Sequence, residues 1–208
     1  MTHRGANLSL VTYSDGTQRV LKATQIKGPD PELVFGAKTE IELLAQLAHP
    51  GIIPCQDAFI RAELNEIALL LPYCEGGDLR VWLEGRNGVH LSEADVLFFF
   101  VQIALSLEYV HFHNILHRDL KPANLLLSKG LCYLADFGVA TVLETSSLHT
   151  DAGTPQYMSP ELVRNEGYSW PSDVWALGCV LYELIDLTPT FTGFLFSVAY
   201  DALCCFIG

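Results

Sequence analysis

Three short motifs rich in charged residues and glycine occur in a fixed order in the second half of the chain. The first runs from His117 to Asn124 (HRDLKPAN), the second is Asp136-Phe137-Gly138, and the third runs from Gly153 to Glu161 (GTPQYMSPE). A single D-F-G would be weak evidence for any function. Three such motifs in this order and at these spacings are strong evidence for one particular catalytic architecture.

Size and composition are those of a folded domain that does not bind nucleic acid through a basic face. The chain has 208 residues, of which 50% are apolar, so it can bury a sizeable core in one domain or two small lobes. The net charge of −12 argues against binding of nucleic acid through a basic face. The polar start of the sequence has no signal-peptide pattern, and the six cysteines form no C-x-x-C pair. We therefore expect reduced thiols and a cytoplasmic location, with nuclear or cytoskeletal association as alternatives.

The first 71 residues predict a small β-rich unit with one helix. Two strands are expected within Leu8–Lys22, around a turn at Ser14–Thr17. Asp30-Pro31 opens a helix, with the aspartate as its cap. Two further strands are expected at Ile52–Phe59 and Glu66–Leu71.

The remainder predicts a mainly helical unit after a glycine-containing linker, Pro72–Asp78. A capping pattern, Ser92-x-x-Asp95, starts a long apolar helix that extends to about His113. Two short strands flank Ser128-Lys129-Gly130. A second helix after Ser172 is apolar on nearly all sides, which predicts a buried helix. The apolar stretch Phe191–Gly208 is marginal in length for a membrane span, and no membrane role is expected.

With these motifs the sequence resembles the eukaryotic protein kinases of the Ser/Thr type, and within them most closely the NIMA-related kinases. The NIMA-like stretches include Tyr73–Leu79 (YCEGGDL) and Ala176–Leu184 (ALGCVLYEL). The resemblance implies an α+β, bilobal fold with a small β-rich lobe and a larger helical lobe. The expected units are residues 1–71 (N-lobe), 72–78 (hinge), 79–192 (C-lobe) and 193–208 (a divergent apolar tail), together one kinase domain.

The resemblance also assigns chemical roles for transfer of the ATP γ-phosphate to serine or threonine of a protein. Asp119 would be the catalytic base, and Lys121 would neutralise charge on the transferred group. Asn124 and Asp136 would hold Mg²⁺, which prefers oxygen ligands. Lys22 would bind the α- and β-phosphates and pair with Glu40 on the N-lobe helix. The residues expected to contact ATP are Lys22, Leu71, Pro72, Cys74, Asp78, Asn124, Leu126 and Asp136.

Regulation and substrate preference follow from the same resemblance. Arg118 would bind a phosphate on the segment between Asp136 and Glu161. The candidate acceptors are Ser146, Ser147 and Thr150, and Thr150 is the expected one. Thr154 would hydrogen-bond near Asp119 and Lys121 rather than take phosphate. Residues 72–208 hold 16 acidic and 6 basic residues. This excess is either an ordinary solvated surface or a field that attracts substrates with basic residues near the acceptor. The oligomeric state cannot be predicted.

Both ends depart from the family pattern. In the nearest register of the glycine-rich loop, from His3 to Leu10, only Gly5 matches and Leu8 occupies a glycine position. The strand before the loop is not recognisable, and the pattern stops at about Thr192. We therefore expect a truncated kinase domain. The alternatives to an active kinase are a catalytically impaired scaffold or a non-functional fragment.

A metal site is a separate interpretation of the histidines. His111, His113 and His117 have ligand-like spacing. However, His117 belongs to the first motif, where in the family it packs behind Phe137, and the other two close a helix whose dipole favours them. Zinc is therefore not expected.

Overall fold

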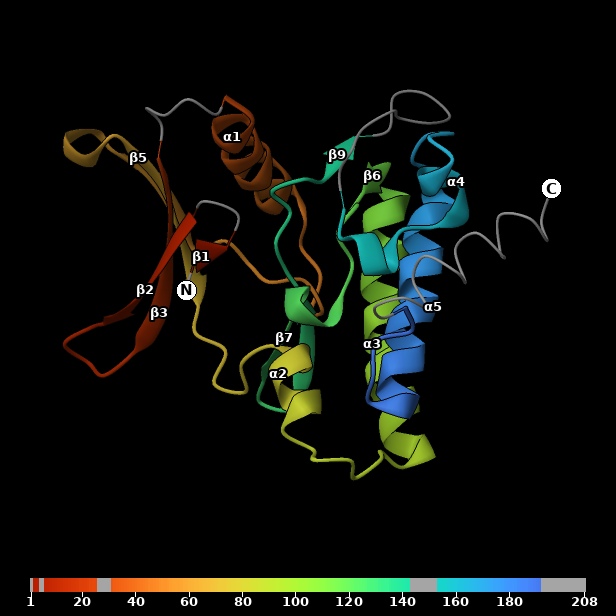
Figure 1. Ribbon diagram of the computed structural model, residues 1–208. Helices are drawn as coiled ribbons and strands as arrows, with labels where there is room; N and C mark the ends of the chain where they lie inside the picture. The colour runs from red at the N-terminus through yellow and green to blue at the C-terminus, as the bar shows by residue number, and fades with distance from the viewer. Residues whose placement is uncertain (1, 4–5, 26–30, 143–152, 192–208) are drawn as a thin grey trace.

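The small lobe is a five-stranded antiparallel sheet with one helix. The computed structural model describes residues 2–3, 6–25, 31–142 and 153–191. The strand order is β1-β2-β3-β5-β4, and helix α1 (Pro31–Gln46) lies beside the sheet (Figure 1). The strands are β1 (Thr2–His3), β2 (Ala6–Thr12), β3 (Gln18–Gln25), β4 (Asp57–Arg61) and β5 (Glu66–Pro72). A short 3₁₀ helix, η1 (Ala62–Leu64), connects β4 to β5.

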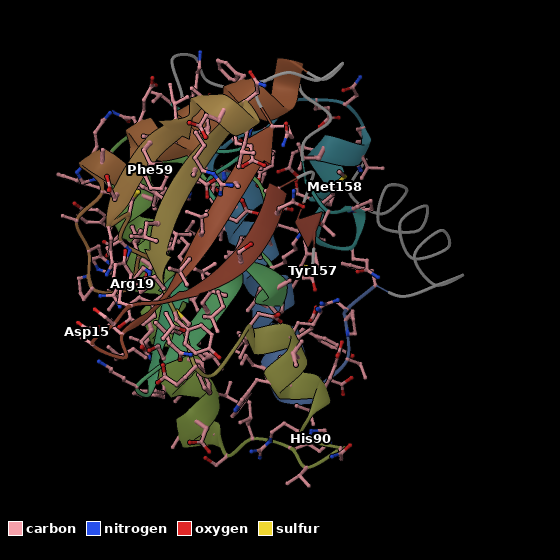
Figure 2. All side chains as sticks on the ribbon, turned by 90° about the vertical axis from the view of Figure 1, so that its left-hand side faces the viewer. Asp15, Arg19, Phe59, His90, Tyr157 and Met158 are labelled. Atoms are coloured by element: carbon pink, nitrogen blue, oxygen red, sulfur yellow. The ribbon has the colours of Figure 1, made fainter. Side chains whose placement is uncertain are left out.

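The predicted hairpin within Leu8–Lys22 is confirmed as β2 and β3. Its turn is closed by Asp15, whose carboxylate accepts a hydrogen bond from the Thr17 amide (2.8 Å). Gly16 has a φ of +83°, which a glycine adopts without strain. Figure 2 shows Asp15 and Arg19 at this corner of the lobe and Phe59 on the same sheet.

The expectation for the start of the chain was partly wrong. A two-residue strand, β1, does precede β2 and pairs with it, His3 opposite Ala6. Leu8 is not in the connecting turn: it lies inside β2, paired with Lys22 on β3. The ladder between β2 and β3 confirms a strand at Leu8, and the loop register itself stays a prediction. Gly5 itself lies outside the described residues, as does Asp30, the expected helix cap.

The strand expected at Ile52–Phe59 begins only at Asp57. The preceding residues pair with the large lobe instead: the Ile53 amide donates to the Leu134 carbonyl (3.0 Å), and the Leu134 amide donates to Gly51 (2.8 Å). Ile52 and Ile53 are almost fully buried there. The apolar run that resembled a strand thus belongs to the segment between α1 and β4, and it packs against the large lobe.

The large lobe is built around two long helices that pack against each other, α3 (Glu93–Phe112) and α5 (Trp170–Asp186) (Figure 1). The Ser92 hydroxyl caps α3 by accepting from the Asp95 amide (3.1 Å), as predicted. The smaller elements, in chain order, are α2 (Leu79–Glu84), β6 (Ile115–Leu116), η2 (Pro122–Asn124), β7 (Leu125–Ser128), β8 (Leu131–Leu134), β9 (Thr141–Val142), η3 (Pro155–Tyr157) and α4 (Pro160–Val163).

Both long helices are apolar, but each is buried on only part of its surface. By length and composition α3 could cross a membrane, but one of its faces, with Ile103 and Leu107, is buried in the core.

The prediction that α5 is a buried helix is only half right. Leu184 is fully buried, whereas Val174 and Ile185 are each 55% exposed. The helix also starts earlier than expected, at Trp170, because Ser169 and Ser172 form a reciprocal capping box.

Candidate active site

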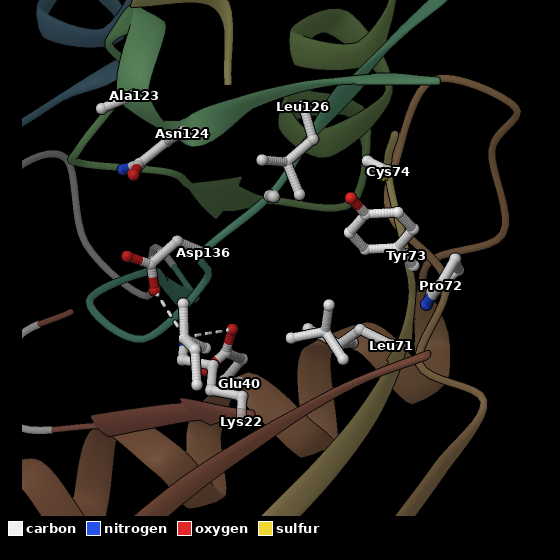
Figure 3. A pocket seen from close by; sticks show the side chains of 13 residues that line it. Lys22, Glu40, Leu71, Pro72, Tyr73, Cys74, Ala123, Asn124, Leu126 and Asp136 are labelled. Atoms are coloured by element: carbon white, nitrogen blue, oxygen red, sulfur yellow. Dashed lines mark hydrogen bonds and ion pairs between the residues drawn. The ribbon is translucent and has the colours of Figure 1, made fainter. Parts of the chain in front are cut away.

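A cavity of about 180 Å³ lies between the two lobes. Strands β2 and β3 and helix α1 form one side, the end of β5 forms the back, and η2, β7 and the loop after β8 form the other side (Figure 3). Its lining residues are Leu8, Val20, Lys22, Glu40, Leu71, Pro72, Tyr73, Cys74, Ala123, Asn124, Leu126, Ala135 and Asp136. Seven of the eight residues expected to contact ATP therefore meet in one place, although they come from both halves of the chain.

Three charged side chains form the polar end of this cavity. The Lys22 ammonium donates to both carboxylate oxygens of Glu40 (2.8 and 2.7 Å) and to Asp136 Oδ1 (2.8 Å). Burial alone would lower the pKa of Lys22, but the two carboxylates outweigh it and raise that pKa above its ordinary value. Lys22 is thus a fixed positive charge, oriented by α1 from one side and by the D-F-G segment from the other.

The other end of the cavity is apolar and is closed by the segment that joins the lobes. Leu71, Pro72 and Cys74 line it on one side and Leu126 on the other (Figure 3). Burial raises the pKa of the Cys74 thiol to about 11, so the thiol stays protonated at neutral pH. An apolar cavity end of this kind suits a planar heterocycle.

Asp78 does not join the other predicted ligands. Its carboxylate accepts from the Val81 amide (3.0 Å) and caps α2, and Asp78 is not among the residues that line the cavity. An aspartate that precedes a short helix is favoured as its N-cap. In this structure Asp78 therefore has a structural contact, and its contact with a nucleotide stays a prediction.

The predicted base, Asp119, is buried within a ring of hydrogen bonds. Its carboxylate accepts from the Thr154 hydroxyl at Oδ1 (2.7 Å) and, at Oδ2, from the Asn124 amide (2.9 Å) and the Lys121 ammonium (2.9 Å). Lys121 also donates to Thr154 Oγ1 (2.7 Å). The expectation that Thr154 bonds near Asp119 and Lys121 is confirmed. These contacts hold one orientation of a carboxylate that can accept a proton from a hydroxyl group.

The loop that carries Asp119 is held by a residue to which the sequence analysis gave no role. Asp173, on α5, is fully buried and accepts from the backbone amides of His117 (2.9 Å) and Arg118 (3.0 Å). It also accepts from the Tyr168 hydroxyl (2.7 Å) and contacts His111 Nε2 at 2.9 Å. Two bonds to consecutive amides stabilise the positive φ of Arg118 (+64°). The sequence signal was an acidic residue in the first turn of a largely apolar helix.

The oxygen ligands expected for Mg²⁺ also lie in the cavity. The Asn124 side-chain amide donates to the Asp119 carbonyl (2.8 Å) and carboxylate, which leaves Oδ1 buried without a hydrogen-bond partner. A buried acceptor without a donor is costly unless something else coordinates it. Together with the Asp136 carboxylate it is a pair of hard oxygen donors, so the residues fit a magnesium ion.

The remaining predicted residues are placed as follows. The Arg118 side chain donates from Nε to the Val139 carbonyl (2.5 Å), and Thr150 lies outside the described residues. His117 is fully buried, and its ring contacts Phe137 edge-to-face with centroids 5.0 Å apart, as expected. His113 bonds to the Tyr109 carbonyl, away from His117. Within the described ranges, no three metal-binding side chains come together.

Comparison with known proteins agrees with this geometry. The sequence pattern of the family described as "Protein kinase domain" matches residues 8–195. Serine/threonine-protein kinase Nek1 of Mus musculus is 40% identical over 190 residues, which are 90% of this chain and 16% of that protein. Nek5 of Homo sapiens is 39% identical (86% of this chain, 26% of that protein), and Nek2 of Mus musculus is 42% identical (78% and 41%). The chain thus spans less than half the length of these relatives.

Proposed function

The chain belongs to the protein kinase family, and from that premise we propose that it transfers the γ-phosphate of ATP to serine or threonine residues of proteins. The observation that best supports this is the position of Lys22, which bonds Glu40 and Asp136 together. A lysine held in this way provides a fixed cation for the phosphates at the polar end of the cavity, while the apolar end would take the adenine. Because phosphoryl transfer depends mainly on positioning and charge neutralisation, such an arrangement supplies much of what the reaction needs.

The residues of the large lobe would perform the transfer itself. Asp119 would orient the acceptor hydroxyl and take its proton, and Lys121 would neutralise charge on the transferred group. Thr154 would hold both side chains in place through its hydroxyl. Asn124 and Asp136 would hold Mg²⁺, and the ion, when bound, would neutralise phosphate charge. The protein's own contribution is the orientation of these groups before ATP arrives.

The direct test is phosphate transfer with a matched pair of variants. Asp119→Asn should abolish transfer to a serine peptide, while the variant should still melt cooperatively and be stabilised by Mg-ATP. A nucleotide at about 100 times its Kd adds roughly 2.7 kcal/mol of stability. Glu108→Gln, an exposed carboxylate on α3, is the control and should keep full activity. Transfer that survives Asp119→Asn would contradict the proposal.

The same measurements separate the alternatives. A catalytically impaired scaffold would be stabilised by Mg-ATP or by a partner without any transfer that depends on Asp119. A non-functional fragment would show no cooperative melt. This comparison is needed because only Gly5 matches the glycine-rich pattern, and a side chain at a glycine position would hinder close approach of the backbone to the phosphates.

We further propose that phosphorylation of Thr150 activates the enzyme through Arg118 and that substrates carry basic residues near the acceptor. A phosphate would add nearly two negative charges opposite an arginine that adjoins Asp119. Thr150→Ala should lower the transfer rate, and Ser146→Ala and Ser147→Ala test the other two candidate acceptors, where no loss is expected. Peptides with arginine on both sides of the serine should react faster than peptides with glutamate. Equal rates for the two peptides would refute the preference.

A further inference from the structure

Strand β4 (Asp57–Arg61) forms an open edge of the five-stranded sheet. The strand order places it last, after β5, and within the described ranges no other strand pairs with it. The opposite edge, β1, has only two residues, whereas β4 has five. Figure 2 shows Phe59 on this strand. No residue of β4 lines the cavity between the lobes, so the proposed reaction does not account for this edge.

The backbone groups of Ala58 and Ile60 point away from the sheet. The Ala58 amide donates to the Asp57 carboxylate (2.8 Å), a side chain of its own strand, so it points out of the ladder with β5. Because the direction of the backbone groups alternates along a strand, those of Ile60 point outward as well, and those of Phe59 point toward β5. The edge therefore offers an N–H and a C=O from each of two residues to a further strand.

Large apolar side chains on both faces of this edge are in solvent. Ile60 is 69% exposed and Phe59 is 40% exposed, although the β5 residues opposite them, Ile67 and Ala68, are buried. Successive side chains of a strand point to opposite faces, so neither face of the edge is polar at its centre. Edge strands are commonly protected by a lysine or a proline. Strand β4 has neither, and its only charges are at its two ends.

The charges at the ends of β4 complement those of a second copy. Its sequence begins with Asp57, has Phe59 at the centre and ends with Arg61. When two copies lie antiparallel with their Phe59 residues opposite each other, Asp57 of each copy lies opposite Arg61 of the other. Opposite charges across neighbouring strands are stabilising and like charges are destabilising. A parallel arrangement in the same register would instead bring like charges together, so the charge pattern favours antiparallel pairing.

The rest of the small lobe does not oppose the approach of a second copy strongly. Residues 1–71 hold eight acidic and six basic residues, whereas residues 72–208 hold 16 and 6, so most of the negative charge is on the other lobe. Arg61 already lies 3.3 Å from Glu66 on β5. In the antiparallel pair its guanidinium would lie between two carboxylates, Glu66 of its own chain and Asp57 of the second copy.

We propose that β4 pairs antiparallel with β4 of a second copy of this chain, which joins the two small-lobe sheets into one. Ala58 of each copy exchanges two backbone hydrogen bonds with Ile60 of the other. The two Phe59 residues form the pair without backbone bonds, which is the pair whose side chains approach most closely. On pairing, the Ala58 amide exchanges the Asp57 carboxylate for a carbonyl of the second copy, and the carboxylate is released to bind Arg61.

Sedimentation equilibrium of the whole chain without nucleotide, between about 1 and about 200 μM, tests the association. The mass should rise from 23.0 kDa toward twice that value. Asp57→Arg and Arg61→Asp should each remain monomeric, because each places like charges opposite each other. An equal mixture of the two variants should associate again, because the strand ends of one are both basic and those of the other are both acidic. Glu108→Arg makes the same charge change as Asp57→Arg at an exposed site on α3, and it should not prevent association.

Cross-linking tests the register of the pair. The Cα atoms of the two Phe59 residues would be about 4.5 Å apart, within the range that a disulfide can bridge. Phe59→Cys should therefore give a disulfide-linked dimer on mild oxidation. Ile60→Cys lies opposite Ala58 of the second copy and should give no more dimer than the unchanged chain, which controls for its own cysteines. Thermal melts show that each variant is folded.

Three results would overturn the proposal. The first is an unchanged chain that stays monomeric at about 200 μM. The second is a pair of charge variants that associate singly as well as they do when mixed, which would place the contact elsewhere on the surface. The third is equal cross-linking by Ile60→Cys and Phe59→Cys, which would exclude a pair centred on Phe59.

Discussion

The ammonium of Lys22 bonds both carboxylate oxygens of Glu40, at 2.8 and 2.7 Å, across the gap between strand β3 and helix α1. Glu40 is only 2% exposed and cannot turn to solvent instead. Strand β3 sets the position of the lysine, and the buried face of α1 sets the position of the glutamate. The ion pair therefore depends on the position of α1 relative to the sheet. The contact to Asp136 extends this alignment into the large lobe.

Glu40→Gln should reduce kcat/KM for phosphate transfer at least tenfold, which is about 1.4 kcal/mol of transition-state stabilisation. The neutral amide holds the ammonium less firmly, so Lys22 would turn toward Asp136. Steady-state kinetics should show a higher KM for ATP as well as a lower kcat. Glu42→Gln, two residues away on the exposed side of α1, should behave like the unchanged protein. If both variants lose the same activity, the pair does not position the phosphates.

Thr154→Val should lower kcat about tenfold or more with little change in KM for ATP. Valine has the same shape but lacks the hydroxyl that bonds both Asp119 and Lys121. Thr154→Ser keeps that hydroxyl and should retain most of the rate. This pair of variants distinguishes positioning of the base from packing, because valine keeps the volume and loses the hydroxyl, whereas serine keeps the hydroxyl and loses the methyl group. Full activity of the valine variant would exclude the role.

Asp173→Asn should destabilise the fold at pH 7 by about 3 kcal/mol, because the buried amides of His117 and Arg118 would lose an ionised acceptor. Burial alone would raise the pKa of Asp173. Hydrogen bonds from His111 and Tyr168 are among the contacts that outweigh burial and hold the pKa below its ordinary value.

A carboxyl group with a lowered pKa stabilises the fold above its unfolded pKa of about 3.9, and this stability is lost as the pH falls through the folded value. Urea unfolding between pH 7 and pH 3 should therefore show the gap between Asp173→Asn and the unchanged protein narrowing below about pH 4. Asp186→Asn, on the exposed side of α5, should stay within about 0.5 kcal/mol at every pH. A gap that does not change with pH would mean that the charge of Asp173 is not what stabilises the loop.

Gly51→Ala should destabilise the protein by about 1–3 kcal/mol. An added Cβ would lie 2.1 Å from the buried Ser106 hydroxyl, which donates to the Gly51 carbonyl (2.9 Å). Gly178→Ala is the matched control. No atom lies within 4 Å of its Cβ position, and alanine at an exposed site in α5 should stabilise the helix by up to about 1 kcal/mol. Thermal melts measure both.

A double-mutant cycle identifies the cause of the first loss. In a Ser106→Ala background the clash is removed, so Gly51→Ala should cost clearly less than it does alone. An unchanged cost would locate the effect elsewhere in the segment between α1 and β4.

Local sequence patterns determined the elements whose signals are short-range. The Ser92 cap, the hairpin around Asp15 and the turn at Lys129-Gly130 were predictable because a few neighbouring residues fix each of them. The motif order also identified the residues that meet around Asp119 and Lys22. Their assembly could be expected only through the family resemblance, since nothing local relates Lys22 to Asp136.

Long-range contacts decided the rest. Ile52 and Ile53 were predicted to begin a strand of the small lobe, yet they pair with Leu134 of the large lobe, which is distant in sequence. No strand was recognised at the start of the chain, yet Thr2 and His3 form β1 by pairing with β2. Asp78 was predicted to contact ATP, yet it caps α2. Asp173 was given no role, yet it accepts the backbone hydrogen bonds that hold the loop carrying Asp119. The physical reason is the same in each case: a side chain's neighbours across the fold, which the chain order does not specify, decide which hydrogen bonds it makes and how deeply it is buried.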